Sequence, residues 1–285
     1  MRVHSAGVSL EVHEHSSWAR GRPSVLLVHG YPDQQQVWDR LLAALPHDEL
    51  HLVTYDVRGA GASDVPRKRA GYRTELLLED LAAVVAATVP GDEPVHLVGH
   101  DWGSVQLWDA VNAERGHPRL AGRIASFTSI GGPSLDPPPG RRRPRPLPML
   151  RQLRASWYVA AFQVPVLPEV GWRLAGGPPP LMRAQAGGTS VWGPELIPNA
   201  AHGLGLYRAN IPHRLRHPRR LRTDVPVLVV RPLRDAFVTE MLYDGLDTAC
   251  TDLRVVELDA GHWVMVSRPH ELAALVLEHV RRTAA

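Results

Sequence analysis

The sequence of 285 residues contains one cysteine, Cys250, and one lysine, Lys68. A single cysteine cannot form an intramolecular disulfide, so a small disulfide-stabilised secreted fold is excluded and a reducing compartment is favoured. No histidine motif surrounds Cys250, and we do not expect cysteine catalysis. Because lysine is nearly absent, almost all the positive charge is arginine, a bias that indicates a GC-rich genome rather than a function.

Long hydrophobic runs are absent as well. Nowhere are there about 18 consecutive apolar residues, so no membrane span is predicted. Residues 1–13 alternate apolar and polar side chains as a strand does, and they lack the apolar core of a signal peptide. With 44% hydrophobic and 21% charged residues, the composition is that of a globular protein, and we expect it in the cytoplasm.

Positive charge is concentrated in two stretches, Arg141–Arg154 and Arg214–Arg222, although the formal net charge of the chain is only +3. Both stretches are interleaved with proline and contain no recognised nucleic-acid-binding motif. We therefore expect them to form solvated surface, and we expect no nucleic-acid partner. Attraction to an anionic membrane surface is the remaining alternative for these arginines.

Short apolar segments with strand character recur along the chain and alternate with helix-like stretches such as Thr74–Val89. They are Ser24–Val28, His51–Tyr55, Val95–Val98, Ile124–Ile130, Val225–Val230 and Leu253–Leu258. This alternation predicts an α/β fold with a mainly parallel sheet and helices on both faces. From about residue 132 to 223 the pattern breaks, because no comparable strand occurs and the recognisable segments look helical. We therefore predict a core of residues 1–132 and 224–285 with an inserted helical cap, residues 133–223.

The pentapeptide Gly99–Gly103, GHDWG, follows one of these strands and precedes a helix-like segment. Small residues two before and two after the central position allow a sharp turn between strand and helix. Asp101 stands at the apex of that turn, where a carboxylate can attack carbon and form an ester with the enzyme. Such a nucleophile favours alkylating substrates, epoxides or haloalkanes, over esters. Taken alone, Asp101 is equally compatible with a helix cap or a turn residue.

Two more groups of a catalytic set follow the last two predicted strands. Asp235 comes shortly after one, and His262 comes after the other, preceded by glycine. Catalytic groups gather at the carboxyl ends of parallel strands, so we expect both to lie near Asp101. His262 would take a proton from water while Asp235 orients its ring. Asp244 and Asp247 are alternatives for the acid, and His262 could instead cap the last helix.

The order of nucleophile, acid and histidine, together with the segments HGYPD (29–33), DVRGAGASD (56–64) and GHDWG (99–103), resembles the α/β-hydrolase superfamily and, within it, the epoxide hydrolase branch. The resemblance covers essentially the whole chain. It is greatest to the hydrolase part of bacterial proteins that fuse such a domain to a short-chain dehydrogenase; no dehydrogenase half is expected here. It implies an α/β-hydrolase fold, and it implies that the backbone N–H groups of Tyr31 and Trp102 stabilise an oxyanion.

The resemblance also assigns residues in the cap. A carboxylate opens an epoxide readily only if a donor hydrogen-bonds the departing ring oxygen, and a neutral tyrosine suits this task. The segments around Tyr158 and Tyr207 are similar to those in which epoxide hydrolases carry their paired ring-opening tyrosines. We expect Phe162 and Trp157 to contact substrate. Since apolar side chains dominate the predicted cap interior, the expected partners are a hydrophobic epoxide and water.

Two other functions stay open. A haloalkane dehalogenase would share Asp101, but it needs N–H donors for the halide besides Trp102; the cap tryptophans Trp157, Trp172 and Trp192 are candidates. A non-catalytic ligand-binding protein with the same fold is the alternative of another class. The oligomeric state is open too, and a homodimer is compatible with the sequence.

Several polar residues near these motifs are expected to be structural. His29 and His100 have no metal-binding spacing on a single element, so we expect neither a metal nor a cofactor. Asp56 and Arg58 are expected to brace the second loop as a charge pair. In the segment before Asp235, the dipeptide at 231–232 is Arg-Pro where related sequences usually show an aromatic residue and glycine.

Overall fold

The computed structural model describes residues 1–112, 117–141 and 145–284. Its centre is an eight-stranded sheet in the order β1-β2-β4-β3-β5-β6-β7-β8. The six strands β3 to β8 run parallel to one another. The strands are β1 Arg2–Ser5, β2 Val8–Glu14, β3 Ser24–Val28, β4 His51–Tyr55, β5 Val95–His100, β6 Ile124–Ile130, β7 Val227–Pro232 and β8 Leu253–Leu258. The predicted α/β fold is confirmed.

The N-terminal residues differ from the sequence-based expectation of a single strand. They form a hairpin, β1 and β2, in which β1 pairs antiparallel with β2 and β2 pairs antiparallel with β4. Ala6 and Gly7, with φ of 42° and 81°, reverse the chain between the two strands. Both values lie in the left-handed region, which glycine adopts readily and which suits a tight hairpin turn.

Helices cover both faces of the sheet. α2 (Thr74–Thr88) and α3 (Trp102–Val111) pack on one face, and α1 (Asp39–Ala44), α9 (Val264–Ser267) and α10 (Pro269–Thr283) pack on the other. Side chains of a strand alternate between the two faces, so Leu26 belongs to one apolar cluster and Leu27 to the other. In the part of the chain that the structure describes, four short 3-10 helices lie in connecting segments: Gln35–Trp38, Arg69–Tyr72, Glu240–Tyr243 and Leu246–Thr248.

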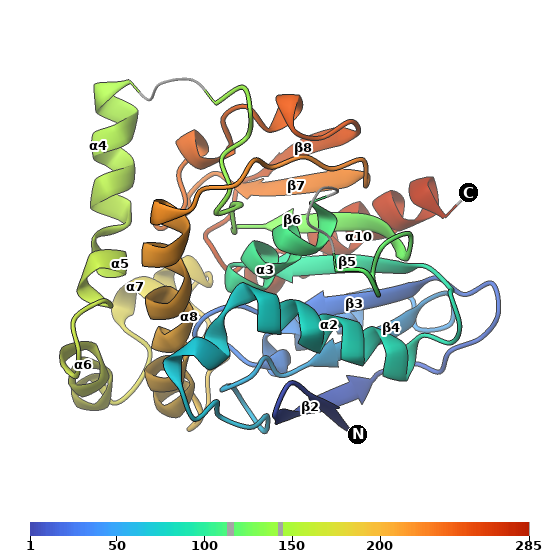
Figure 1. The fold of residues 1–285 in the computed structure, drawn as a ribbon, viewed down its shortest axis with the longest axis horizontal. Coiled ribbons are helices and arrows are strands. Elements are labelled where there is room, and N and C mark those ends of the chain that lie inside the picture. The colour runs from blue at the N-terminus through green and yellow to red at the C-terminus, as the bar shows by residue number, and fades with distance from the viewer. Residues whose placement is uncertain (113–116, 142–144, 285) are drawn as a thin grey trace.

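The described residues between β6 and β7 form five helices, which gather to the left of the sheet in Figure 1. They are α4 Pro146–Ala155, α5 Trp157–Ala161, α6 Leu167–Ala175, α7 Pro180–Gln185 and α8 Leu196–Arg216. All five fall within residues 133–223, and the division of the chain into core and cap at these limits stays a prediction. None of the helices in the described part of the chain is both long and apolar enough to cross a bilayer.

Two charged groups differ from their sequence-based assignments. Arg58 does not pair with Asp56; it makes two hydrogen bonds of 2.6 Å to the buried Asp80 of α2, which offers the bidentate geometry that a guanidinium favours. Asp56 instead accepts backbone N–H groups of its own loop and of the 3-10 helix at Gln35.

Arg214, placed by the sequence analysis on a solvated surface, is buried. Its guanidinium lies 2.6 Å from Asp109 of α3 and 2.7 Å from Asp136, and both carboxylates are buried too. The prediction for residues 214–222 is therefore wrong at its first residue, because α8 turns that side chain toward the core. A buried charge is tolerated when it is paired in this way.

Candidate active site

Asp101 stands at the sharp turn between β5 and α3, with φ of 49° and ψ of −121°. A non-glycine residue with positive φ is strained by about 1–3 kcal/mol, and such strain persists where neighbouring structure holds it. The neighbours are close: a Cβ on Gly103 would lie 2.0 Å from the carbonyl oxygen of Val28, and one on Gly30 would lie 2.5 Å from Cβ of Asp101. Glycine at these positions therefore lets the turn form and presents the carboxylate.

His262 lies between two carboxylates. Its Nδ1 is 2.8 Å from Oδ2 of Asp235, and its Nε2 is 3.6 Å from Oδ2 of Asp101. The other oxygen of Asp235 accepts the backbone N–H groups of Phe237 and Val238 at 2.8 and 3.0 Å, which fixes the carboxylate for the imidazole. The structure thus brings together the three residues expected from the strand ends, and it places Asp235 as the carboxylate hydrogen-bonded to the histidine.

The protonation of His262 follows from this position. Burial disfavours the charged imidazolium, but the Asp235 and Asp101 carboxylates outweigh burial and raise the pKa of His262 to about 10. At neutral pH the histidine therefore holds a proton. It can act as a base only after one of these negative charges has gone.

The loop after β3 reaches the same carboxylate. The backbone N–H of Tyr31 donates to Oδ1 of Asp101 at 2.8 Å, so one expected oxyanion donor already contacts the carboxyl group. Trp102, the other expected donor, is the first residue of α3, where backbone N–H groups have no partner within the helix. The contact of the Tyr31 N–H with the carboxyl group is therefore observed, and the role of the Trp102 N–H stays a prediction.

A cavity of about 350 Å³ opens over Asp101 and His262. Its lining comes from the core loops and from the cap helices: Tyr31, Pro32, Asp101, Arg154, Ala155, Trp157, Tyr158, Phe162, Trp172, Pro179, Leu181, Met182, Tyr207, Ala236, Phe237, His262 and Trp263. Most of these side chains are apolar or aromatic, and the volume suits a small organic molecule. Of the polar groups around the cavity, His262 and the backbone N–H of Tyr31 lie against Asp101.

Tyr158 and Tyr207 line this cavity together with Asp101. Their ring centroids are 6.0 Å apart. Burial raises the pKa of both hydroxyls, and the charge of Asp101 raises each further. Both hydroxyls are therefore protonated at neutral pH and can donate a hydrogen bond, as the expected role requires.

Of the two expected substrate contacts, Phe162 lies deeper than Trp157. The Phe162 ring packs edge-on against Tyr31, Tyr158 and Tyr207, with centroids 5.0–5.5 Å apart. Trp157 lines the cavity too, but 68% of its surface is exposed, so it stands at the mouth.

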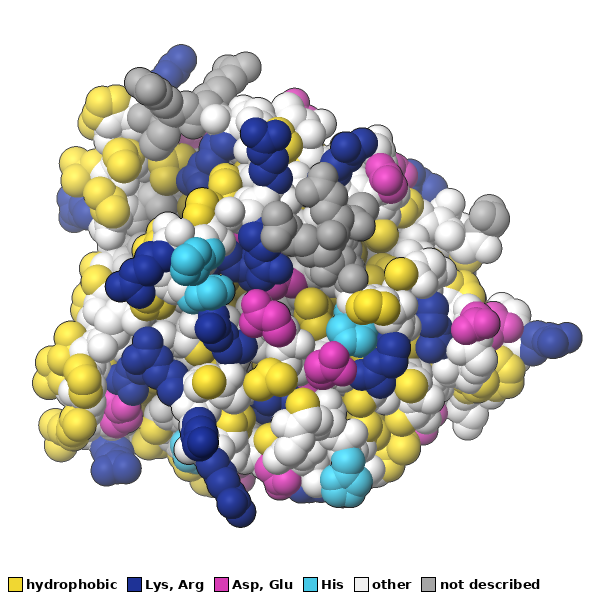
Figure 2. Space-filling model, in the orientation of Figure 1, with side chains coloured by type: hydrophobic (Ala, Val, Ile, Leu, Met, Phe, Trp, Pro, Cys, Tyr) yellow, Lys and Arg dark blue, Asp and Glu magenta, His cyan; other side chains and the backbone are white. Residues whose placement is uncertain are grey.

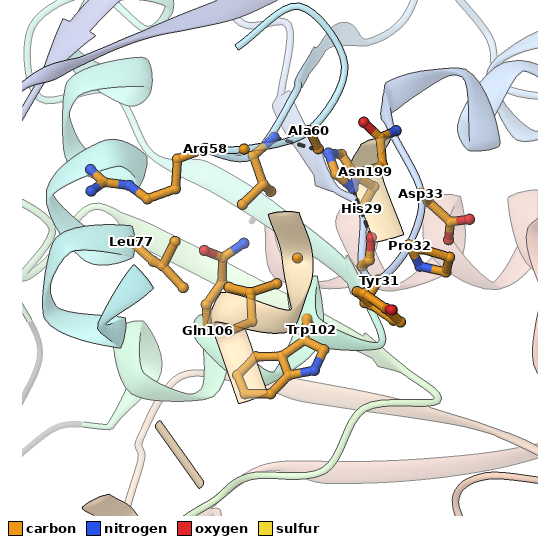
Figure 3. A pocket seen from close by; sticks show the side chains of 15 residues that line it. His29, Tyr31, Pro32, Asp33, Arg58, Ala60, Leu77, Trp102, Gln106 and Asn199 are labelled. Atoms are coloured by element: carbon orange, nitrogen blue, oxygen red, sulfur yellow. Dashed lines mark hydrogen bonds between the residues drawn. The ribbon is translucent and has the colours of Figure 1, made fainter. Parts of the chain in front are cut away.

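A second, smaller cavity lies behind the Tyr31 loop (Figure 3). Its volume is about 20 Å³, far below the space that an organic substrate needs. His29 borders it with both ring nitrogens engaged, one with the backbone N–H of Val57 and the other with the carbonyl of Gly30. These bonds agree with a structural role for His29. Across the described segments, no cluster of three or more His, Cys, Asp or Glu side chains could hold a metal ion.

Sequence reasoning missed Gln185, the last residue of α7. Its side-chain oxygen accepts the backbone N–H of Ala236 at 3.1 Å and that of His262 at 3.0 Å. One cap residue thus connects the loop of the acid to the loop of the histidine. An uncharged residue at the end of a six-residue helix carries no sequence signal for such a contact.

Asp33, in the loop of Tyr31, was missed as well. This buried carboxylate accepts the indole N–H of Trp192 at 2.8 Å and that of Trp263 at 2.9 Å, so it joins the loop to the cap and to the residue after His262. The indole donor of Trp192 is therefore engaged with a carboxylate and is not free for a halide.

Residues 23–269 match the family described as alpha/beta hydrolase fold. The chain belongs to this α/β-hydrolase family. It is 36% identical over 272 residues to a protein of Mycobacterium tuberculosis named probable oxidoreductase EphD, covering 89% of this chain and 45% of that protein. It is 32% identical over 187 residues to epoxide hydrolase A of the same organism, covering 65% and 53%. The chain spans about half the length of these curated relatives.

Solved structures of epoxide hydrolases have the same fold. The Bacillus megaterium enzyme in complex with an inhibitor matches with a TM-score of 0.77 at 19% identity, over 99% of this chain and 100% of that chain. Epoxide hydrolase A from Mycobacterium thermoresistibile matches with a TM-score of 0.73 at 24% identity, over 99% and 97%. At these identities the likeness establishes the α/β-hydrolase fold, as predicted, and the chemistry has to be argued from the site.

Proposed function

We propose that this α/β hydrolase is an epoxide hydrolase that converts a hydrophobic epoxide into a vicinal diol through an alkyl ester on Asp101. The observation that carries the proposal is the shared cavity: Tyr158 and Tyr207, two protonated hydroxyl donors, line it together with Asp101 and His262. A carboxylate nucleophile facing two such donors suits a substrate whose leaving oxygen stays attached and needs a proton.

In the first step, a carboxylate oxygen of Asp101 attacks a ring carbon. The carbon–oxygen bond of the ring breaks, and the ring oxygen takes a proton from a tyrosine hydroxyl. The ester that forms is neutral, so the charge of Asp101 no longer supports the protonated state of His262. His262 gives up its proton, which restores the tyrosine hydroxyl, and the imidazole becomes a base.

In the second step, neutral His262 removes a proton from water, and the resulting hydroxide attacks the carbonyl carbon of the ester. Negative charge develops on the carbonyl oxygen, where the N–H of Tyr31 already contacts the carboxyl group and the N–H of Trp102 is expected to contribute. When this intermediate collapses, the bond between the carbonyl carbon and the alkoxide oxygen breaks. The alkoxide takes the proton of the new carboxylic acid, so the diol leaves and Asp101 is again a carboxylate. Asp235 stabilises the imidazolium that forms again when His262 takes the proton from water, through the 2.8 Å hydrogen bond.

The proposal is tested by trapping the ester. His262→Gln removes the base and leaves the nucleophile, so incubation with styrene oxide should raise the intact mass of the protein by one epoxide. Asp101→Asn, which lacks the nucleophile, is the matched control and should gain no mass. If a folded His262→Gln protein stays unmodified while the wild type forms diol, the ester mechanism is ruled out. A wild-type single turnover in heavy-oxygen water should leave the diol unlabelled.

A haloalkane dehalogenase would use the same nucleophile, but two of the candidate cap tryptophans are poorly placed to donate an N–H to a halide. Trp192 donates to Asp33, and Trp157 is 68% exposed. The engaged indole of Trp192 and the exposure of Trp157 favour epoxide over halide. Substitution of the paired tyrosines tests this choice. The imidazole placed between two carboxylates argues against the non-catalytic alternative.

A further inference from the structure

Most of the large hydrophobic side chains that are exposed in the described residues lie in the cap. Of the sixteen large hydrophobic side chains that are exposed in the described part of the chain, eleven lie in α4–α7 or the short segments between them. They are Leu147, Met149, Leu150, Leu153, Trp157, Val164, Val166, Leu167, Val170, Leu174 and Leu181, and together they form what we call the cap face. Figure 2 shows the yellow side chains along the left edge, where Figure 1 places α4 and α6. Concentrated apolar exposure of this kind marks an interaction site.

The cap face follows helical spacing. On α4 and into α5, Leu147, Leu150 and Leu153 recur every three residues and are 55–70% exposed, and Trp157 continues the row. Residues at this spacing share one side of a helix, which is the side a soluble helix normally buries. α6 repeats the pattern with Leu167, Val170 and Leu174, the last of which is 83% exposed. Two amphipathic helices thus turn apolar sides outward.

Positive charge accompanies this apolar surface. Arg145, Arg151, Arg154, Arg173 and Arg183 are all exposed along α4–α7. The single acidic residue of these helices, Glu169, is bound by Arg208 through both carboxylate oxygens. Two cap faces brought together would place these arginines opposite one another, whereas an anionic surface would neutralise them. Arginine can lay its carbon chain on apolar surface while its charge reaches phosphate groups.

The mouth of the active-site cavity lies on this same surface. Trp157 and Leu181 belong to the cap face, and both also line the cavity above Asp101, as does the neighbouring Arg154. A hydrophobic molecule dissolved in a bilayer under the cap face would therefore meet the cavity without crossing water.

We propose that the cap face binds the surface of an anionic lipid bilayer and that the enzyme takes its substrate from the membrane. Leucine and tryptophan side chains insert among the headgroups while the arginines bind lipid phosphates, the mode of an interfacial amphipathic helix. The binding itself is independent of the catalytic proposal. The uptake of an epoxide through the cap rests on the proposed function and deepens it by naming a membrane-dissolved substrate.

The test compares two variants that differ in location. Leu150→Glu/Leu174→Glu places two negative charges on the cap face, away from the cavity lining. Leu215→Glu, in the last turn of α8, is the matched control, because Leu215 is 79% exposed and lies outside the cap face. Binding is measured by co-sedimentation with vesicles of phosphatidylglycerol and phosphatidylcholine, and with vesicles of phosphatidylcholine alone, at low and high salt.

We expect the wild type and Leu215→Glu to bind the phosphatidylglycerol vesicles within about twofold of each other, and the double variant to bind at least about 10-fold more weakly. Binding should fall at high salt and on phosphatidylcholine alone. The double variant should keep the wild-type kcat/KM for styrene oxide in solution and lose activity toward a long-chain epoxide held in vesicles.

Equal binding by all three proteins, or none by the wild type, would overturn the proposal. A wild-type dimer that Leu150→Glu/Leu174→Glu dissociates, seen by analytical ultracentrifugation without vesicle binding, would assign the cap face to a second copy instead. If no epoxide is hydrolysed and the double variant alone loses vesicle binding, the membrane surface stands and the catalytic proposal fails. The two ideas are therefore separable.

Discussion

Nε2 of His262 lies 3.6 Å from Oδ2 of Asp101, beyond the length of a hydrogen bond, while Oδ1 of Asp101 accepts the N–H of Tyr31 at 2.8 Å. The carboxylate is therefore held through Oδ1. Its second oxygen, Oδ2, faces His262 and is free to attack the substrate. In the proposed mechanism the same side later admits the water that His262 activates. The gap between His262 and Asp101 therefore suits both proposed steps, because it leaves the nucleophile free in the first and gives the base access to water in the second.

The paired tyrosines decide between epoxide and halide chemistry. Tyr158→Phe or Tyr207→Phe removes one of two donors, so we expect epoxide opening to slow by roughly 10- to 1000-fold, the scale of a lost general acid. The double variant should nearly abolish it. Halide departs without protonation, so a dehalogenase would lose far less. Diol formation and free halide are measured against an epoxide panel and a 1-halohexane panel. Halide release by a wild type that makes no diol would favour the dehalogenase.

The raised pKa of His262 predicts a pH-dependent stability. The folded-state pKa of about 10 exceeds the ordinary value of 6.5, so the folded protein holds this proton more tightly than the unfolded chain. This contribution is complete below pH 6.5 and is lost as the pH rises toward 10. Urea unfolding across that range should show the wild type losing stability relative to His262→Gln. Asp101→Asn, which keeps only one of the two carboxylates, should lose less.

Gln185 is expected to position the acid and the base from the cap. Gln185→Leu leaves the N–H groups of Ala236 and His262 without their acceptor, and we expect ester hydrolysis to slow by about 10- to 100-fold, as small displacements of catalytic groups do. Gln185→Glu retains an acceptor oxygen and should restore most of the rate. Single-turnover kinetics, with the pH profile of the hydrolytic step, separate positioning from general destabilisation. A Gln185→Leu protein with an unchanged pH profile and an unchanged rate of ester hydrolysis would refute this role for Gln185.

Arg214 is expected to stabilise the joint between α8 and the core. Arg214→Met leaves the buried carboxylates of Asp109 and Asp136 without their main partner, which should lower the free energy of unfolding by about 3–5 kcal/mol. Arg216→Met, two residues further along at an exposed position, should change it by less than about 0.5 kcal/mol. Urea denaturation measures both. Equal effects of the two substitutions would show that the buried pairing contributes little.

The sequence by itself determined the α/β class, most of the parallel strands and the turn at Asp101. These features depend on local pattern: apolar runs bounded by turns predict strands, and the glycines around Asp101 permit a turn that larger residues would block. The succession of Asp101, Asp235 and His262 was readable for a related reason, because parallel strands present their carboxyl ends at one edge of a sheet.

Only the tertiary structure decided the partners of Arg58 and Arg214 and the contacts of Gln185. Arg214 and Asp109 are 105 residues apart, and Gln185 is 77 residues from His262, so their meeting depends on how the cap packs against the core. The exposure of the cap face was also decided only by the tertiary structure. Apolar spacing along α4 and α6 indicates which residues share a side of each helix, but whether that side turns inward or outward is set by the packing of the whole helix, which no local pattern records.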